Sequence, residues 1–293
     1  MGERDTNGLV EKVQAMERRA RQRKLDDLDR LPQQLPFWDD SQRGLPNTLA
    51  RGALFTAVKY DRDRQKRDYY EGKLVATLSG FKLEYHGQEL RQDDASVFMT
   101  LLHLARHTPL GQSLRFTAYA MLKELGWSIN SAEYKHLREC CTRLSATNVT
   151  VSIHNGTQGY AGSLVRSFAW KDEAGKQLSQ WQVDLEPRIA ALFAENTFTL
   201  LEWGERKRIG GRAPLALWLH SFLCTHREPL PISVEKYHEL SASRTSNLYD
   251  FKTRLQRALQ KLVDMGFLTA YSVRNDIVYV TRRTRKPLAA AVL

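Results

Sequence analysis

The sequence predicts an α+β protein whose two halves repeat one order of elements. The 293 residues are enough for about two domains of ordinary size. Apolar residues recur at helical spacing in several long segments and alternate with polar residues in several short ones. In each half a helix, a short helix, a turn, a long helix and a β-hairpin are predicted in the same order.

Residues 1–48 differ in composition from the rest of the chain. Residues 11–30 are rich in Glu, Arg, Lys and Gln and lack a strong apolar stripe, which predicts a mobile segment. Pro32, Pro36 and Pro46 then indicate an extended linker. We therefore expect the first domain to begin near residue 49.

The first predicted domain spans residues 49–187. Apolar residues at helical spacing predict a buried helix over residues 95–107 and a second helix over 117–125, which Gly126 ends. Residues 130–131 offer an N-cap for a third helix that extends to about Ala146. Period-two patterns predict strands at 73–79, 81–86, 148–154, 164–170 and 181–185.

The second predicted domain spans residues 188–293. An apolar helix is expected over residues 215–225, and Ser233 is the expected N-cap of a short helix. A long helix follows from about residue 248 to 265, and Gly266 ends it. The predicted strands are 267–273 and 277–281, joined by a tight turn at 274–276.

The two halves can be aligned through their long helices. With Leu144 matched to Leu262, the predicted strand openings Val149 and Phe267 also coincide. This shared order predicts two tandem winged-helix domains, in which a β-hairpin, the wing, follows a helix-turn-helix. Two unrelated α+β domains are the alternative.

The charge balance favours a polyanionic partner. Lys and Arg number 44 against 33 Asp and Glu, a formal net charge of +11. Nucleic acid is the first candidate and an anionic membrane surface the second, and a merely basic protein is the alternative. The sequence has no run of ~20 apolar residues and begins with a polar segment, so we expect a cytoplasmic protein without a membrane partner.

The long helix of the second half has the pattern of a DNA-reading helix. Leu248, Phe251, Leu255, Leu259 and Leu262 fall on one face, which predicts packing on the domain core. Arginines on the other side could pair with guanine edges in the major groove, although a solvated charged face is the alternative. The predicted DNA contacts of this helix and the preceding turn are Arg244, Thr245, Ser246, Asn247, Arg254, Arg257 and Lys261.

The first half repeats this design with a weaker basic face, and the second hairpin and the tail add further basic residues. A hairpin tip can reach phosphates or the minor groove, and a basic tail suits phosphate contact, with a solubilising tail as the alternative. The predicted contacts are Lys135, Arg138 and Thr142 in the first half and Arg274, Asn275, Arg282, Arg283 and Arg285 in the second.

No motif indicates catalysis. The sequence lacks the P-loop pattern G-x-x-x-x-G-K-[ST] and the metal-binding pattern HExxH. The neighbouring Tyr69 and Tyr70 could supply a nicking nucleophile, but no histidine pair in a relaxase-like hydrophobic context accompanies them. We therefore expect no enzymatic activity, no cofactor and no metal.

The segments RGALFTAVKY and YDFKTRLQRALQKLVDMGFL, within a similarity over nearly the whole chain, resemble the TrfA family of initiators from broad-host-range IncP plasmids. The resemblance implies binding to repeated origin sites (iterons) in double-stranded DNA, opening of an A+T-rich region, and recruitment of the host helicase with DnaA. It also implies a monomer–dimer equilibrium, with the first domain in dimer contacts and the second as the stronger reader. Single-stranded DNA of the opened origin is a further implied ligand.

The linker contains a second resemblance. Gln34, Leu35, Pro36, Phe37 and Trp38 are similar to the pentapeptide by which bacterial proteins dock on the DNA polymerase sliding clamp. The segment departs from the usual pattern at Pro36 and Trp38. In the alternative interpretation, Phe37 and Trp38 attach the linker to its own domain.

Two other functions fit a basic chain of this organisation. A tandem winged-helix transcriptional regulator would bind an operator as a dimer. A DNA-processing enzyme would cut or nick its DNA. An initiator should instead bind direct repeats and distort an A+T-rich neighbour.

Overall fold

Two hydrophobic cores organise the protein, which we describe from a computed structural model covering residues 34–58, 66–78, 81–153, 158–172 and 174–283. Residues between Leu35 and Trp203 build the first core, and residues between Ile209 and Val278 build the second. Helices and small sheets contribute to both, so the α+β class is confirmed.

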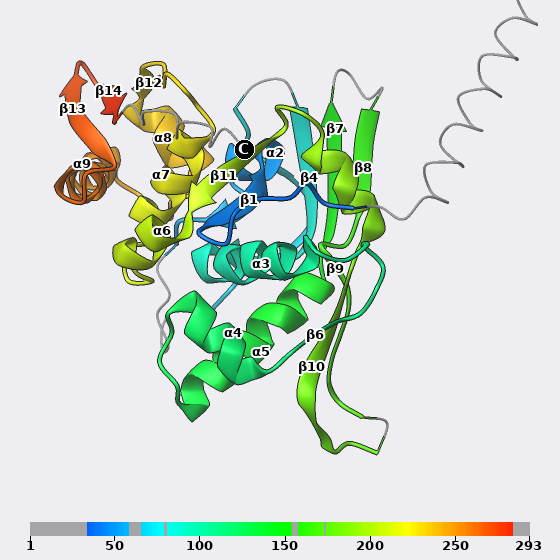
Figure 1. The fold of residues 1–293 in the computed structure, drawn as a ribbon. Helices are drawn as coiled ribbons and strands as arrows, with labels where there is room; N and C mark the ends of the chain where they lie inside the picture. Colours follow the sequence, from blue (N-terminus) through cyan, green and yellow to red (C-terminus); the bar gives the residue numbers. More distant parts are fainter. Residues whose placement is uncertain (1–33, 59–65, 79–80, 154–157, 173, 284–293) are drawn as a thin grey trace, which may run out of the picture.

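The first unit is built around α3 (Gln92–Ala105), which crosses the middle of the molecule (Figure 1). Phe98, Leu101 and Leu102 of this helix have no exposed surface. An antiparallel sheet in the order β6-β10-β9 flanks the helices, and its hairpin β9–β10 projects from the body (Figure 1). The other elements of the first unit are β6 (Leu114–Phe116), α4 (Ala118–Leu125), α5 (Ser131–Ser145), β9 (Val165–Lys171) and β10 (Gln177–Leu185).

Local hydrogen bonds explain where α4 and α5 begin and end. The Thr117 hydroxyl accepts from the Ala120 amide at 3.1 Å, and the Asn130 side chain accepts from the Glu133 amide at 3.0 Å. Gly126 closes α4 with a φ of 71°, which glycine adopts without strain. The predicted stop at Gly126 and the predicted cap at Asn130 are therefore confirmed.

A further four-stranded sheet, in the order β3-β4-β7-β8 (Figure 1), contributes Leu83, Tyr85, Val149 and Val151 to the first core. Val149 pairs with Tyr85 in this sheet, so it does not open the hairpin that corresponds to Phe267. The alternation of Val149 and Val151 specifies a half-buried strand but not its partner. The corresponding hairpin is β9–β10. The strands of the sheet are β3 (Tyr69–Val75), β4 (Phe81–Gln88), β7 (Asn148–Ile153) and β8 (Gln158–Gly162).

The boundaries of the first core differ from the predicted ones. Leu35 and Trp38 are 2% exposed, so the described chain joins the core well before residue 49. Ile189 and Phe193 also lie in the first core, beyond the predicted limit at residue 187. The elements concerned are β1 (Gln42–Pro46), which pairs with β11 (Phe198–Glu202), α2 (Asn47–Ala50), the 3₁₀ helix η1 (Pro187–Phe193) and α6 (Trp203–Ile209), while β2 (Phe55–Thr56) pairs in parallel with β5 (Leu90–Arg91).

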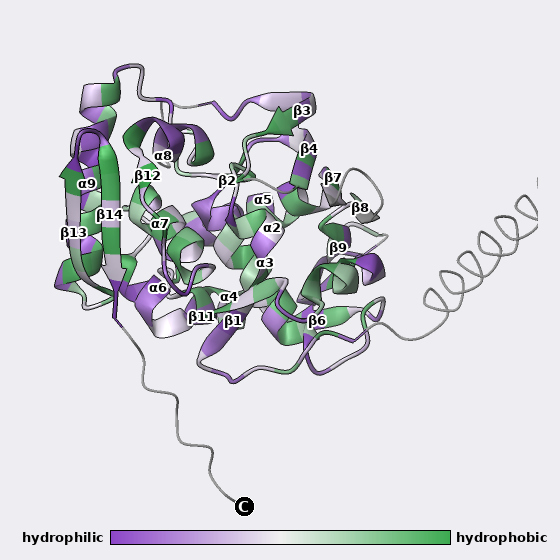
Figure 2. Ribbon diagram, turned by 90° about the horizontal axis from the view of Figure 1, so that it is seen from above, coloured by the Kyte–Doolittle hydropathy of each residue, from purple (hydrophilic) through white to green (hydrophobic). Residues whose placement is uncertain are grey.

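The second unit repeats the order helix, strand, helix, helix, strand, strand. Its sheet has the order β12-β14-β13, and α9 with the β13–β14 hairpin forms the outer edge of the molecule (Figure 2). Asn275 and Asp276 have φ values of 48° and 59°, as a two-residue hairpin turn requires, so the predicted turn is confirmed. The elements are α7 (Pro214–Cys224), β12 (Ile232–Ser233), α8 (Val234–Leu240), α9 (Leu248–Asp264), β13 (Leu268–Arg274) and β14 (Ile277–Arg282).

A buried arginine joins the two units. Arg206 is 3% exposed and donates to Ser96 and Gln92 of α3 and to Ser221 and Leu217 of α7, at 2.9–3.2 Å. These acceptors are all neutral, and burial lowers the pKa of the guanidinium to about 9. The bonds therefore hold α3 and α7 in one arrangement.

Candidate nucleic-acid interface

The helix α9 is anchored by one apolar face. Phe251, Leu255, Leu259 and Leu262 have no exposed surface, which confirms most of the predicted inner face. Leu248 is 41% exposed and does not belong to it, because the first turn of the helix extends past the core. Hydrophilic and hydrophobic residues alternate along this helix (Figure 2).

Three cations of α9 are not neutralised by any carboxylate of the described residues. Arg254, Arg257 and Lys261 are exposed, and no carboxylate of the described residues lies within 4.0 Å of them. The first unit differs, because Lys135 lies 4.0 Å from a carboxylate oxygen of Glu139. Unpaired guanidinium and ammonium groups on one helix create a positive potential that attracts phosphate.

The corresponding residues of α5 are less free to bind DNA. The Arg138 guanidinium lies 5.7 Å from the ring centroid of Trp170, an aromatic contact between α5 and β9. Thr142 is exposed. The prediction of a weaker basic face on α5 therefore agrees with these contacts.

The cationic side of α9 lines a groove of about 800 Å³. The opposite wall comes from the α6–α7 loop, the first turn of α7 and the chain at Ala57 and Val58. Arg212 stands in that wall. In the sequence, only its place in the basic run of residues 205–212 marks it as a possible DNA contact. The groove is lined by Ala57, Val58, Arg212, Ala213, Pro214, Leu215, Ala216, Ser243, Arg244, Thr245, Ser246, Asp250, Arg254, Arg257, Ala258 and Lys261.

The turn before α9 is held from two sides. Arg244 forms ion pairs with Asp68 at 2.8 Å and with buried Glu89 at 3.0 Å, so this predicted phosphate contact is engaged by the first core. The Thr245 hydroxyl accepts from Arg254 at 3.1 Å. Ser246 is exposed in the groove lining.

The start of α9 and the tip of the β13–β14 hairpin both carry predicted DNA contacts. The Asn247 side chain accepts from the Tyr249 amide at 2.8 Å, so it caps α9. Arg274 and Asn275 are exposed at the hairpin turn. Lys252 of α9 pairs with Asp276 at 2.7 Å and ties the hairpin tip to the helix.

The predicted tail contacts separate into two kinds. The Arg282 guanidinium donates to the carbonyls of Leu223 at 3.1 Å and His226 at 2.7 Å, and it lies 5.3 Å from the Phe267 ring centroid. These bonds give Arg282 a structural role. Arg283 is exposed, and Arg285 lies outside the described residues.

The segment resembling a clamp-docking peptide is packed against its own domain. Gln34 donates to a backbone carbonyl at the end of α3 at 2.8 Å. Leu35 and Trp38 are 2% exposed, and the Trp38 indole donates to His103 at 3.1 Å. Phe37 points outward, with 73% of its surface exposed, and Gln34 is exposed as well. The contacts favour the alternative interpretation, in which this segment tethers the chain to its core.

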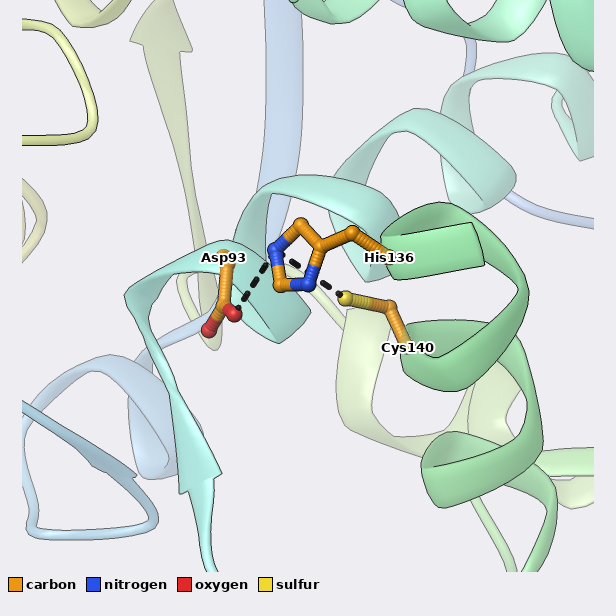
Figure 3. A group of neighbouring side chains, drawn as sticks. All are labelled: Asp93, His136 and Cys140. Carbon is orange, nitrogen blue, oxygen red and sulfur yellow. Dashed lines mark hydrogen bonds and ion pairs between the residues drawn. The ribbon is translucent and has the colours of Figure 1, made fainter. Parts of the chain in front are cut away.

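A buried cluster joins α3 to α5. His136 lies between Asp93, at 3.1 Å, and Cys140, at 3.9 Å (Figure 3). Arg67 pairs with Asp93 at 2.7 Å, and Arg143 lies 3.2 Å from the Cys140 sulfur.

The electrostatics of this cluster oppose a metal ion. Burial raises the pKa of Asp93, but the bond from His136 and the charge of Arg67 outweigh it and hold that pKa well below its ordinary value. Burial raises the pKa of the Cys140 thiol, which favours the protonated sulfur. The guanidiniums of Arg67 and Arg143 already contact Asp93 and Cys140, and their positive charges would repel a cation. We assign the cluster to helix packing.

The described helices are not suited to a bilayer. Among the residues with described structure, none of the helices combines the length and the apolar composition that crossing a membrane requires.

These features define an α+β protein with two similarly ordered units and a cationic surface on the long helix of the second. The chain belongs to the TrfA protein family, whose sequence model matches residues 2–282, so the predicted resemblance is confirmed. It is 30% identical over 247 residues to the plasmid replication initiator protein TrfA of Escherichia coli. The alignment covers 84% of this chain and 63% of that protein, so this chain spans less than two thirds of the relative.

The fold is also similar to a solved structure. The crystal structure of domains 2 and 3 of RctB superposes with a TM-score of 0.52, at 12% sequence identity. The match covers 82% of this chain and 99% of that one. At this identity the likeness concerns the fold alone.

Proposed function

We propose that this protein is a plasmid replication initiator that binds repeated origin sites in double-stranded DNA through two winged-helix domains. The first and second units are these domains, and the hairpins β9–β10 and β13–β14 are their wings. Membership of the TrfA family supports the role in initiation.

The observation that carries the DNA-binding proposal is the surface of α9. One face is fixed to the core, and the exposed cations beside it lack carboxylate partners among the described residues. Each lysine or arginine that neutralises a phosphate releases counterions, which makes binding favourable and salt-dependent. The weaker α5 surface supports a secondary role for the first unit in DNA contact, and the family resemblance suggests its role in dimerisation.

The same proposal includes the later steps of initiation. After iteron binding, the protein opens an adjacent A+T-rich region and recruits the host helicase with DnaA. The opened single strand is a further ligand in this scheme. We propose a monomer–dimer equilibrium in which the monomer binds the origin.

A footprinting experiment tests this function. The full chain is titrated onto a supercoiled plasmid carrying direct repeats from the cognate origin beside an A+T-rich segment, with scrambled repeats as the control. We expect protection of the repeats and permanganate reactivity in the A+T-rich segment only when intact repeats are present. Protection of a palindrome without permanganate reactivity would identify a transcriptional regulator and contradict the initiator role. Nicking that depends on an added metal would indicate an enzyme.

A further inference from the structure

We propose that the groove beside α9 binds the phosphodiester backbone of one DNA strand, with Arg212, Arg254 and Lys261 as its phosphate contacts. This inference rests on the proposed DNA-binding function and deepens it. It separates the residues of α9 that bind phosphate from those that read bases.

Three stripes run along α9 with spacings of three and four residues, so each follows one side of the helix. The first stripe is buried in the second core, and the second lies roughly opposite to it. The third lies on a flank between them and lines the groove. In this order the stripes are Phe251, Leu255, Ala258 and Leu262; Tyr249, Thr253, Gln256 and Gln260; and Asp250, Arg254, Arg257 and Lys261.

The stripe opposite the anchored face is the one that enters most deeply when a helix lies in the major groove. In α9 this stripe carries an exposed Tyr249 and two glutamines but no charge. Glutamine can pair bidentately with adenine N6 and N7, so these residues suit base readout. The arginines on the flank do not occupy that position.

The groove has the chemistry of a phosphate site. Arg212 faces the cationic stripe from the α6–α7 loop, and small apolar residues such as Ala213 and Ala258 lie between them. Apolar atoms cannot bond phosphate oxygens, so those contacts fall to the cations and to the hydroxyls of Ser243, Thr245 and Ser246. Asp250 is the only carboxylate in the lining, against the five cations Arg212, Arg244, Arg254, Arg257 and Lys261, of which Arg244 is already paired.

The length of the cationic stripe favours a strand over a single small anion. From Asp250 to Lys261 the helix rises roughly 16 Å, at about 1.5 Å per residue. One DNA strand carries a phosphate about every 3.4 Å along the duplex axis. Several successive phosphates can therefore lie within reach of the groove.

Salt titration of DNA binding tests the assignment. The probes are a duplex selected by the full chain from a random-sequence pool and a scrambled duplex of equal composition. The groove variants are Arg212→Gln, Arg254→Gln and Lys261→Gln, and Gln256→Ala tests the opposite stripe. Arg227→Gln is the matched control, because Arg227 is exposed beyond the other end of α7 and does not line the groove.

We expect each groove variant to reduce the slope of log K against log salt by about 0.9, the contribution of one phosphate contact. Its affinity for both duplexes should fall by the same factor. Gln256→Ala should instead reduce the ratio of selected to scrambled affinity by roughly 5- to 150-fold and leave the slope unchanged. The control should match the unaltered chain, and circular dichroism should show that all variants are folded.

Two results would overturn the groove assignment while leaving DNA binding intact. In one, the groove variants lower the ratio of affinities without changing the slope, which would make these cations base readers. In the other, they change neither quantity. If the unaltered chain binds neither duplex at low salt, the proposed function itself fails and the groove assignment with it.

Discussion

Replacing Trp38 by alanine should destabilise the protein strongly, although the sequence places this residue in a docking peptide. Its ring is 2% exposed, lies 6.0 Å from the Phe193 ring centroid, and donates a hydrogen bond to His103. Burying about 200 Å² at ~25 cal/mol/Å² corresponds to about 5 kcal/mol as an upper value. Truncation of a buried tryptophan typically costs about 3–5 kcal/mol. We expect a loss in that range.

Urea denaturation followed by circular dichroism measures this loss. At slopes of about 2–3 kcal/mol/M, the midpoint should fall by about 1–2 M. Phe37→Ala is the matched control, because Phe37 is its neighbour but 73% exposed, and it should cost less than about 1 kcal/mol.

An unchanged midpoint for Trp38→Ala would refute the packing argument. The other interpretation, in which this segment docks on the sliding clamp, is tested by measuring whether the folded variants are retained on immobilised clamp. If Phe37→Ala keeps its stability and abolishes retention of a chain that otherwise binds, the segment docks through Phe37.

Three further predictions concern single side chains. Burial, then the charges of neighbouring arginines, lower the pKa of His103 to about 3, so the unfolded chain takes up a proton near pH 6.5 that the folded chain resists. Stability is therefore highest above pH 6.5 and falls below it, by up to about 2 kcal/mol through this residue between pH 7 and 5. His103→Gln should remove that contribution in urea denaturation, whereas His220 and His226, whose pKa values burial also lowers, keep theirs. Arg244→Gln should cost about 1 kcal/mol because buried Glu89 loses one of two guanidiniums, and an unchanged salt slope of DNA binding would show that Arg244 contacts no phosphate. Asn247→Ala should cost about 1 kcal/mol by uncapping α9, and an equal thermal midpoint would contradict that role.

Local signals in the sequence predicted most helix limits. Gly126 and Asn130 act through bonds within a few residues, so their effect can be read without knowing the rest of the fold. The strand at Val149 was recognised from its alternation, but its partner was not. Strand pairing depends on which sheet edge the chain reaches, and β4 lies some sixty residues earlier.

The segment from Gln34 to Trp38 shows a second limit of sequence reasoning. A short peptide with Leu35 and Trp38 fits either an external cleft or an internal one, because both bury the same apolar atoms. The partner that decides is Phe193, more than 150 residues away. Arg206 likewise belongs to a basic run in the sequence, residues 205–212, but its burial between α3 and α7 depends on partners far along the chain.

The helix α9 has one feature that its local sequence pattern predicts and another that depends on distant parts of the chain. Its period shows which face is anchored, because Phe251, Leu255 and Leu262 recur at helical spacing regardless of their neighbours. The period cannot show which of the remaining sides meets another part of the protein. That depends on Val58 and Arg212, which approach from outside the helix and turn the cationic flank into the wall of a groove. A cation in a groove and a cation on an open face have the same sequence pattern, but the first can hold a phosphate between two walls and the second can only meet it from one side.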